Sequence, residues 1–177
     1  FGGSSVGVGK VRSITELKTK LQNLFQTEEK ILLQEFVGGR EVSCGVIEKK
    51  LNGRFIPYAL PATEIIPEND IFDYESKYTI GGSKEITPAD LKIDLMKKVQ
   101  DSALHAHSVL GCEGYSRTDF IIKEDTPFIL ETNTLPGMTA TSILPQQART
   151  IGLGMEELLG NLIESALGGI HAQRKIQ

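Results

Sequence analysis

Two neighbouring segments, residues 114–122 and 127–133, have the alternating pattern of paired β-strands and are separated by a short polar turn. In a hairpin, side chains alternate between the two faces and directly opposite residues share a face. A turn centred on Asp125 predicts a polar face that pairs Asp119 with Glu131 and Arg117 with Asn133. The other face is predicted to be part of the core and to hold Thr118, Phe120, Ile122, Phe128 and Leu130.

The polar face of this hairpin brings two acidic side chains together. Like charges directly opposite each other destabilise a strand pair, and a divalent cation removes that repulsion. Mg²⁺ binds oxygen ligands, commonly one or two carboxylates together with substrate phosphates. Asp119, Glu131 and Asn133 supply such oxygens and Arg117 a fixed positive charge, which favours a site for Mg²⁺ and a polyphosphate. The alternative is a solvent-facing polar surface, which needs no ligand.

Composition limits the class of protein. A chain of 177 residues with 40% hydrophobic and 24% charged residues is typical of one globular domain. The net charge of −4 argues against nucleic acid as a partner, and no apolar run reaches the length of a membrane-spanning helix. Cys44 and Cys112 lack metal or redox spacing, which indicates reduced thiols of a cytosolic protein. The chain starts inside a glycine-rich segment without methionine, which suggests a fragment.

The remaining pattern predicts the following elements. A helix follows the capping box at residues 13–16, and a second long helix starts at Thr87 and ends at Gly111, with His105 and His107 as ordinary helix residues. Strands are predicted at 31–37, at 40–48 and after the Asn52-Gly53 turn, with 60–66 extended. Two helices are predicted at 142–150 and 155–167, the latter ended by Gly168-Gly169 and followed by a frayed tail.

This partial separation of strands and helices predicts an α+β fold with a mostly antiparallel sheet and packed helices. Residues 67–86 contain few core-type residues and carry aromatic and cationic side chains. A connection of this length is usually functional or disordered, so we interpret it as a lid loop.

Five sequence motifs occur in an order that identifies a family. They are GSSVGV at 3–8, EFVGGREV at 35–42, FDYESKYT at 72–79, GCEGYSRTDF at 111–120 and LETNTLPGMT at 130–139. Together they closely resemble the D-alanine–D-alanine ligases, an ATP-grasp family. The resemblance implies that 1–177 is an incomplete C-terminal catalytic domain, in which residues 1–60 are approximately the end of the central ATP-binding subdomain. The family's N-terminal domain and its two earlier ATP-contacting lysines are missing.

The resemblance also implies an activity. ATP phosphorylates the carboxylate of one D-alanine, and the amine of a second D-alanine attacks the D-alanyl phosphate to give D-Ala-D-Ala for peptidoglycan and cell wall synthesis, and so for cell shape. Phosphoryl transfer depends mainly on positioning and charge stabilisation. The implied cofactors are ATP and two Mg²⁺ or Mn²⁺ ions. The implied setting is cytoplasmic, with a homodimer as the intact enzyme and no nucleic acid or membrane partner.

Site residues follow from the same resemblance. The implied catalytic residues are Ser4, Arg117, Gly137 and Ser142, and the implied metal ligands are Asp119, Glu131 and Asn133. The nucleotide-binding residues are Gln34, Glu35, Phe36 and Val37 at the adenine hinge, Glu41 at the ribose, Lys77 and Tyr78 on the lid, and Asn133. Gln34 departs from the family's usual Glu but still accepts a hydrogen bond from the adenine amino group. Tyr78 matches enzymes that use D-alanine rather than D-lactate.

Two other functions remain open on the sequence. One is a different ATP-grasp ligase, such as a D-alanine–D-lactate ligase, although the LPGMT run at 135–139 argues against a general ATP-grasp enzyme. The other is a fragment that binds Mg-nucleotide without catalysis. We expect the isolated fragment to be inactive.

Overall fold

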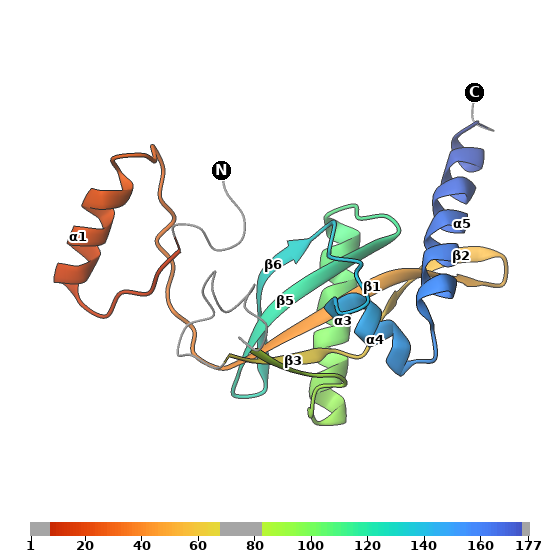
Figure 1. The fold of residues 1–177 in the computed structure, drawn as a ribbon, viewed down its shortest axis with the longest axis horizontal. Coiled ribbons are helices and arrows are strands. Elements are labelled where there is room, and N and C mark those ends of the chain that lie inside the picture. The colour runs from red at the N-terminus through yellow and green to blue at the C-terminus, as the bar shows by residue number, and fades with distance from the viewer. Residues whose placement is uncertain (1–7, 68–82, 175–177) are drawn as a thin grey trace. The chain divides into compact units, whose positions relative to one another are not determined.

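The computed structural model describes residues 8–67 and 83–174, with side chains described for residues 8–66 and 83–168 (Figure 1). The chain divides into two compact units. The first consists of Phe1–Gly38 and Pro67–Lys84, and the second of Gly39–Ile66 and Glu85–Gln177. None of the helices described is long and apolar enough to cross a membrane.

The first unit is built around helix α1 (Ile14–Leu24). The predicted cap is confirmed, since the backbone N–H of Glu16 donates to Ser13 Oγ at 3.2 Å. The Glu16 carboxylate accepts from the N–H of Arg12 at 2.7 Å, one residue earlier than in a regular capping box. The start of this helix is therefore encoded locally.

The predicted strand at 31–37 is wrong. This segment has no regular structure, and Leu32 and Phe36 are 85% and 62% exposed. A strand requires a neighbour to satisfy its backbone hydrogen bonds, and none of the described strands pairs with this segment. Instead, the ammonium of Lys10 lies 3.5 Å from the centre of the Phe36 ring, a cation–π contact.

The second unit contains nearly all of the sheet, which has the strand order β4-β3-β1-β5-β6, with β2 also paired with β1. The strands are β1 (Arg40–Leu51), β2 (Arg54–Ala59), β3 (Thr63–Pro67), β4 (Ser83–Ile86), β5 (Tyr115–Lys123) and β6 (Thr126–Asn133). The pairs β1–β2, β1–β3, β1–β5 and β5–β6 are antiparallel. The predicted α+β class is thus confirmed, while β4 is a strand inside the segment that we interpreted as a lid.

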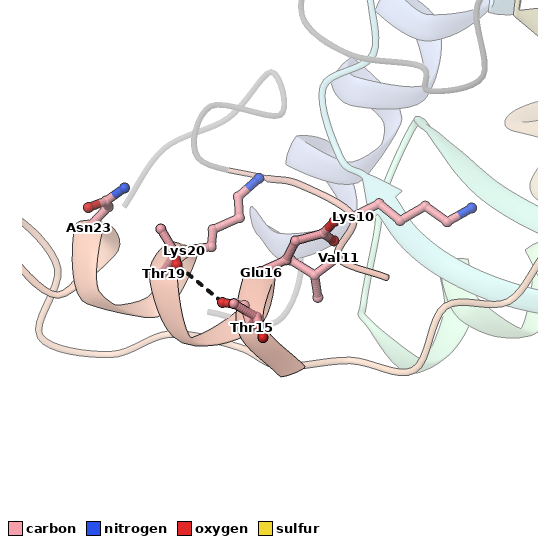
Figure 2. A pocket seen from close by; sticks show the side chains of 7 residues that line it. All are labelled: Lys10, Val11, Thr15, Glu16, Thr19, Lys20 and Asn23. Carbon is pink, nitrogen blue, oxygen red and sulfur yellow. Dashed lines mark hydrogen bonds between the residues drawn. The ribbon is translucent and has the colours of Figure 1, made fainter. Parts of the chain in front are cut away.

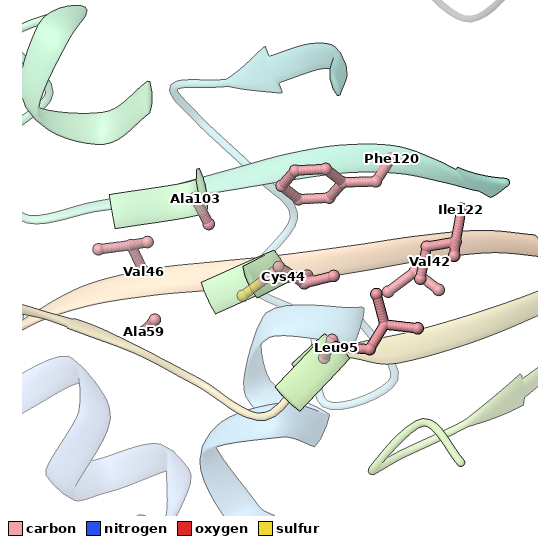
Figure 3. Packing of buried hydrophobic residues seen from close by; sticks show 10 residues of the cluster. Val42, Cys44, Val46, Ala59, Leu95, Ala103, Phe120 and Ile122 are labelled. Carbon is pink, nitrogen blue, oxygen red and sulfur yellow. The ribbon is translucent and has the colours of Figure 1, made fainter. Parts of the chain in front are cut away.

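Helices α3 (Ile93–Val109), α4 (Ile143–Thr150) and α5 (Met155–Arg174) complete the second unit. Strand β1 is buried on both faces because the helices form two separate cores with it. Val42, Cys44 and Val46 pack with α3 (Figure 3), whereas Ile47 packs with α4 and α5. Both cysteines are free, and burial raises the pKa of Cys44 to about 12.

Two helix boundaries differ from the prediction. Helix α3 begins at Ile93 rather than near Thr87, because the preceding segment is bound to the start of β3: Thr87 shares a 2.7 Å hydrogen bond with Thr63, and the N–H of Ala89 donates to Ala62 O at 2.7 Å. Helix α5 continues through Gly168-Gly169 to Arg174. A glycine lowers helix propensity by only about 1 kcal/mol, which does not suffice to end this helix.

The β5–β6 hairpin has the predicted polar register but a different turn. Glu124 and Asp125 both have positive φ, at 50° and 60°, and form a two-residue turn that pairs Lys123 with Thr126. A bulge between Asp119 and Phe120 then shifts the register by one residue, which restores the predicted pairing of Asp119 with Glu131. The two-residue turn places Phe128 opposite Ile121, and the bulge leaves Leu130 without a paired residue. Phe128 and Leu130 are 41% and 48% exposed, so the prediction that both belong to the core is wrong.

His107 takes a place in the buried stripe of α3, although we expected an ordinary helix residue. It is 1% exposed, its Nδ1 lies 2.8 Å from Ser116 Oγ, and its Nε2 has no hydrogen-bond partner. Burial lowers the pKa of His107 from its ordinary value of 6.5, against an opposing contribution from Glu48. The imidazole is therefore protonated less readily in the folded chain than in the unfolded chain.

We expect this buried imidazole to make stability fall in mild acid. The folded state binds the proton less readily than the unfolded state, so the free energy of unfolding decreases as the pH falls below about 6.5. Thermal unfolding at pH 7.5 and 5.5 measures the effect. His107→Gln, which cannot titrate, should show a smaller loss than the parent. His105 lies on the exposed side of the same helix, so His105→Gln should lose as much stability between pH 7.5 and 5.5 as the parent does. The prediction would be contradicted if His107→Gln also lost as much stability as the parent.

Candidate active site

The polar face of the β5–β6 hairpin is organised by a bidentate ion pair. Arg117 donates to Asp119 through Nε at 2.9 Å and through Nη2 at 2.8 Å. Burial lowers the pKa of Arg117, but its hydrogen bonds to Asp119 and the charges of Asp119, Glu131 and Glu85 outweigh this effect, so the pKa is raised above its ordinary value. Two parallel bonds fix the direction of the guanidinium as well as its distance from the carboxylate.

Asp119 also receives hydrogen bonds from two other strands. Ser43 on β1 donates to Oδ1 at 2.6 Å, and the amide of Asn133 on β6 donates to Oδ2 at 3.3 Å. Each carboxylate oxygen therefore accepts two bonds. Ser43 was missed by the sequence prediction, although the alternation of β1 against β5 places it directly opposite Asp119.

The geometry allows a test of whether these residues fit a metal ion. Asp119 and Glu131 are opposite each other, as predicted, and Glu131 is exposed at the surface. The described residues contain no group of three or more His, Cys, Asp or Glu side chains that could hold a metal. Two carboxylates and the amide oxygen of Asn133 are nevertheless oxygen ligands, which suit Mg²⁺ or Mn²⁺ when phosphates and water complete the shell. Asn133 would have to turn its amide oxygen towards the ion.

A second group of predicted residues lies at the start of α4. Ser142 Oγ accepts from the N–H of Thr139 at 3.1 Å and lies 2.8 Å from Thr139 Oγ1, and it does not cap the helix that follows. A Cβ added to Gly137 would lie 2.8 Å from Ser142 Oγ, so a larger residue there would displace the Ser142 hydroxyl. The N–H groups of the first turn of α4 are thus left without a side-chain cap.

Glu85 on β4 connects these two groups and was also missed by the sequence prediction. Gln146 on α4 donates to the Glu85 carboxylate at 2.6 Å and to the carbonyl of Thr141 at 2.8 Å. The charge of Glu85 contributes to the raised pKa of Arg117. The hairpin and the start of α4 therefore belong to one polar region on the α4 side of the sheet.

The other predicted site residues are not tested by this geometry. Ser4, Lys77 and Tyr78 lie outside the described residues. The hinge residues Gln34, Glu35, Phe36 and Val37 lie in the irregular segment of the first unit, and Glu41 lies on β1, opposite Ile121 on β5. Their roles remain predictions.

A pocket of about 450 Å³ lies in the first unit, and its described lining includes none of the predicted site residues. Its lining comes from α1 and the segment before it, namely Lys10, Val11, Thr15, Glu16, Thr19, Lys20 and Asn23 (Figure 2). All seven of these side chains are exposed or half-buried. The candidate site is therefore defined by the hairpin and α4 and not by this pocket.

Solved structures with the same fold define the class of protein. The chain is similar to D-alanine–D-alanine ligase from Coxiella burnetii, with a TM-score of 0.80, 29% identity and coverage of 98% of this chain and 45% of that one. It is similar to the ATP complex of the Bacillus anthracis enzyme of the same name, with a TM-score of 0.74, 26% identity and coverage of 92% and 50%. The VanG D-Ala:D-Ser ligase from Enterococcus faecalis is similar too, with a TM-score of 0.78, 31% identity and coverage of 92% and 46%.

The sequence comparisons identify the family. The chain belongs to the D-alanine–D-alanine ligase family, because the model described as "D-ala D-ala ligase C-terminus" matches residues 1–164. The D-alanine–D-alanine ligase of Leptospira interrogans is 55% identical over 94% of this chain and 47% of that protein, and that of Leptospira biflexa is 47% identical over 94% and 48%. The chain thus spans about half the length of these relatives.

Proposed function

We propose that the protein containing this chain is an ATP-dependent D-alanine–D-alanine ligase, with this chain as its C-terminal catalytic part. The observation that carries the proposal is the polar hairpin, in which Asp119 faces Glu131 and is paired with Arg117. The match of residues 1–164 to the family model supports it. We further propose, from the family resemblance alone, that the full-length enzyme acts in the cytoplasm as a homodimer.

The hairpin residues are proposed to bind the phosphate end of ATP. Asp119, Glu131 and Asn133 hold Mg²⁺ or Mn²⁺, which when bound neutralises phosphate charge. Arg117 provides a positive charge whose direction is fixed by Asp119, as is required for stabilising the phosphoryl group during transfer. Because Arg117 is already held by Asp119, little reorganisation is needed when charge develops.

The start of α4 is proposed to bind the second D-alanine. The uncapped N–H groups of this helix favour a carboxylate, and Ser142 Oγ adds a hydroxyl at the same position. The backbone N–H of Gly137, together with Arg117, is proposed to stabilise the oxyanion formed when the amine attacks the acyl phosphate. The contact between Gly137 and Ser142 supports their acting in one site.

Incubation of the full-length protein with ATP, Mg²⁺ and D-alanine tests this function. We expect stoichiometric release of phosphate and formation of D-Ala-D-Ala, measured by a phosphate assay and by mass spectrometry. D-lactate and D-serine are added as competing second substrates, because the fold is shared with a D-Ala:D-Ser ligase. A depsipeptide or D-Ala-D-Ser as the main product at neutral pH would contradict the dipeptide assignment, and nucleotide binding without turnover would support a non-catalytic domain.

A further inference from the structure

Ser43 on β1 is buried beside the candidate metal ligands but is not itself a metal-binding group in the proposed function. Its side chain is 0% exposed, and its hydroxyl donates to Asp119 Oδ1 at 2.6 Å. Asp119 Oδ1 also accepts from Arg117 Nε at 2.9 Å. Two donors from different strands therefore converge on one oxygen and fix the plane of the carboxylate.

The position of Ser43 is itself fixed by α4. Gln147 is 0% exposed, and its amide donates to the backbone carbonyl of Ser43 at 2.8 Å and to Thr63 Oγ1 at 3.0 Å. Its carbonyl oxygen accepts from the N–H of Gly45 at 2.9 Å. The backbone on both sides of Cys44 is thus hydrogen-bonded to a side chain of α4.

We propose that Ser43 is a positioning residue for Asp119: its hydroxyl orients the carboxylate for binding a divalent cation, and Gln147 holds Ser43 in place. The inference rests on the proposed function, since it concerns the same metal site. Groups that hydrogen-bond to metal ligands fix ligand orientation, and their loss typically lowers metal affinity by about 10- to 100-fold. Without the hydroxyl, Asp119 keeps its pairing with Arg117 but loses the donor that comes from the centre of the sheet.

The test uses Mn²⁺ as a spectroscopic probe. Mn²⁺ is titrated into the full-length protein, with and without ADP, and free Mn²⁺ is followed by electron paramagnetic resonance. We expect Ser43→Ala to raise the Kd for Mn²⁺ about tenfold, with the KM for D-alanine unchanged. Ser43→Thr, which keeps a hydroxyl, should restore most of the affinity.

Ser116→Ala is the matched control. Ser116 is also fully buried in the sheet, on β5, but its hydroxyl faces the α3 side and lies 2.8 Å from His107 Nδ1. This variant loses a buried hydroxyl that does not contact Asp119. Its Kd for Mn²⁺ should therefore stay within about twofold of the parent value, well below the roughly tenfold change expected when a hydrogen bond to a metal ligand is lost. An equal loss in both alanine variants would indicate general loosening of the sheet and would overturn the proposal.

The remaining outcomes separate this inference from the proposed function. If the parent binds Mn²⁺ and Ser43→Ala binds it with the same Kd, only the proposed role of Ser43 is overturned. Absence of uptake by the parent overturns the metal site and the inference together. If Ser43→Ala does not fold, Ser43→Cys fills the same volume with a weak donor and should show the same loss of affinity, whereas parental affinity would overturn the proposal.

Discussion

Asp119→Asn in the full-length protein is expected to lower kcat/KM for D-alanine by about 100-fold or more, the usual effect of removing one electrostatic stabiliser from an active site. Asparagine keeps the shape of the side chain and one accepting oxygen, but it carries no charge. The substitution removes the negative charge of a proposed metal ligand and one of the two acceptors that direct the Arg117 guanidinium. Steady-state phosphate release at saturating ATP measures the loss, and the Mg²⁺ concentration needed for half-maximal activity should rise.

The control for this variant is Asp125→Asn, the same substitution in the same hairpin. Asp125 lies in the exposed turn with φ of 60°, a conformation that asparagine tolerates. Its surface ion pair with Lys92, at 3.0 Å, contributes little to stability. We expect nearly parental activity here. Nearly parental activity of Asp119→Asn as well, in a variant with an unchanged unfolding temperature, would mean that the hairpin carboxylates do not bind metal.

The hairpin shows how far sequence periodicity predicts this site. Alternation placed the four polar residues on one face, which the structure confirms through the pairs Arg117–Asn133 and Asp119–Glu131. The turn was predicted to centre on Asp125, whereas it lies between Glu124 and Asp125. The bulge between Asp119 and Phe120 shifts the strand register back, so that Asp119 still pairs with Glu131. Periodicity contains no information on a bulge, because the bulge depends on how the two strands twist against their neighbours. The apolar face was therefore predicted incorrectly at Phe128, whose partner is set by the turn, and at Leu130, which lies in the bulge.

The residues that the sequence prediction missed come from distant parts of the chain. Ser43 is 76 residues from Asp119, and Glu85 is 61 residues from Gln146. No local spacing connects such pairs; only the strand order and the packing of α4 bring them together. Local signals did predict the cap at Ser13 and the Asn52-Gly53 turn, whose positive φ values of 50° and 78° follow from the residue types.

The strand prediction at 31–37 was wrong for a related reason. Its apolar residues have a strand-like composition, but strand formation depends on pairing and burial more than on intrinsic preference. Here the described residues provide no pairing neighbour, and the segment remains irregular. Composition alone thus indicates what a segment could form, whereas its partners determine what it does form.

Gln147→Leu is expected to lower the free energy of unfolding by about 2–6 kcal/mol, because it leaves two buried backbone groups unpaired. Strand β1 pairs with β3 up to Ser43 and with β2 from Val46 onwards. Between these two pairings, the Gln147 side chain takes the place of a neighbouring strand, accepting from Gly45 N–H at 2.9 Å and donating to Ser43 O at 2.8 Å. Leucine has a similar size but can do neither, and each unsatisfied buried group costs about 1–3 kcal/mol.

Gln146→Leu is the matched control, because the adjacent side chain forms its hydrogen bonds at the exposed surface. Exposed groups are satisfied by water when a partner is lost, so this variant should change the free energy of unfolding by less than about 1 kcal/mol. Urea unfolding gives both values. Hydrogen exchange in peptides that cover residues 40–48 should accelerate in Gln147→Leu alone, since the Gly45 amide loses its acceptor. Equal stability of the two variants would mean that water replaces the Gln147 amide between β2 and β3.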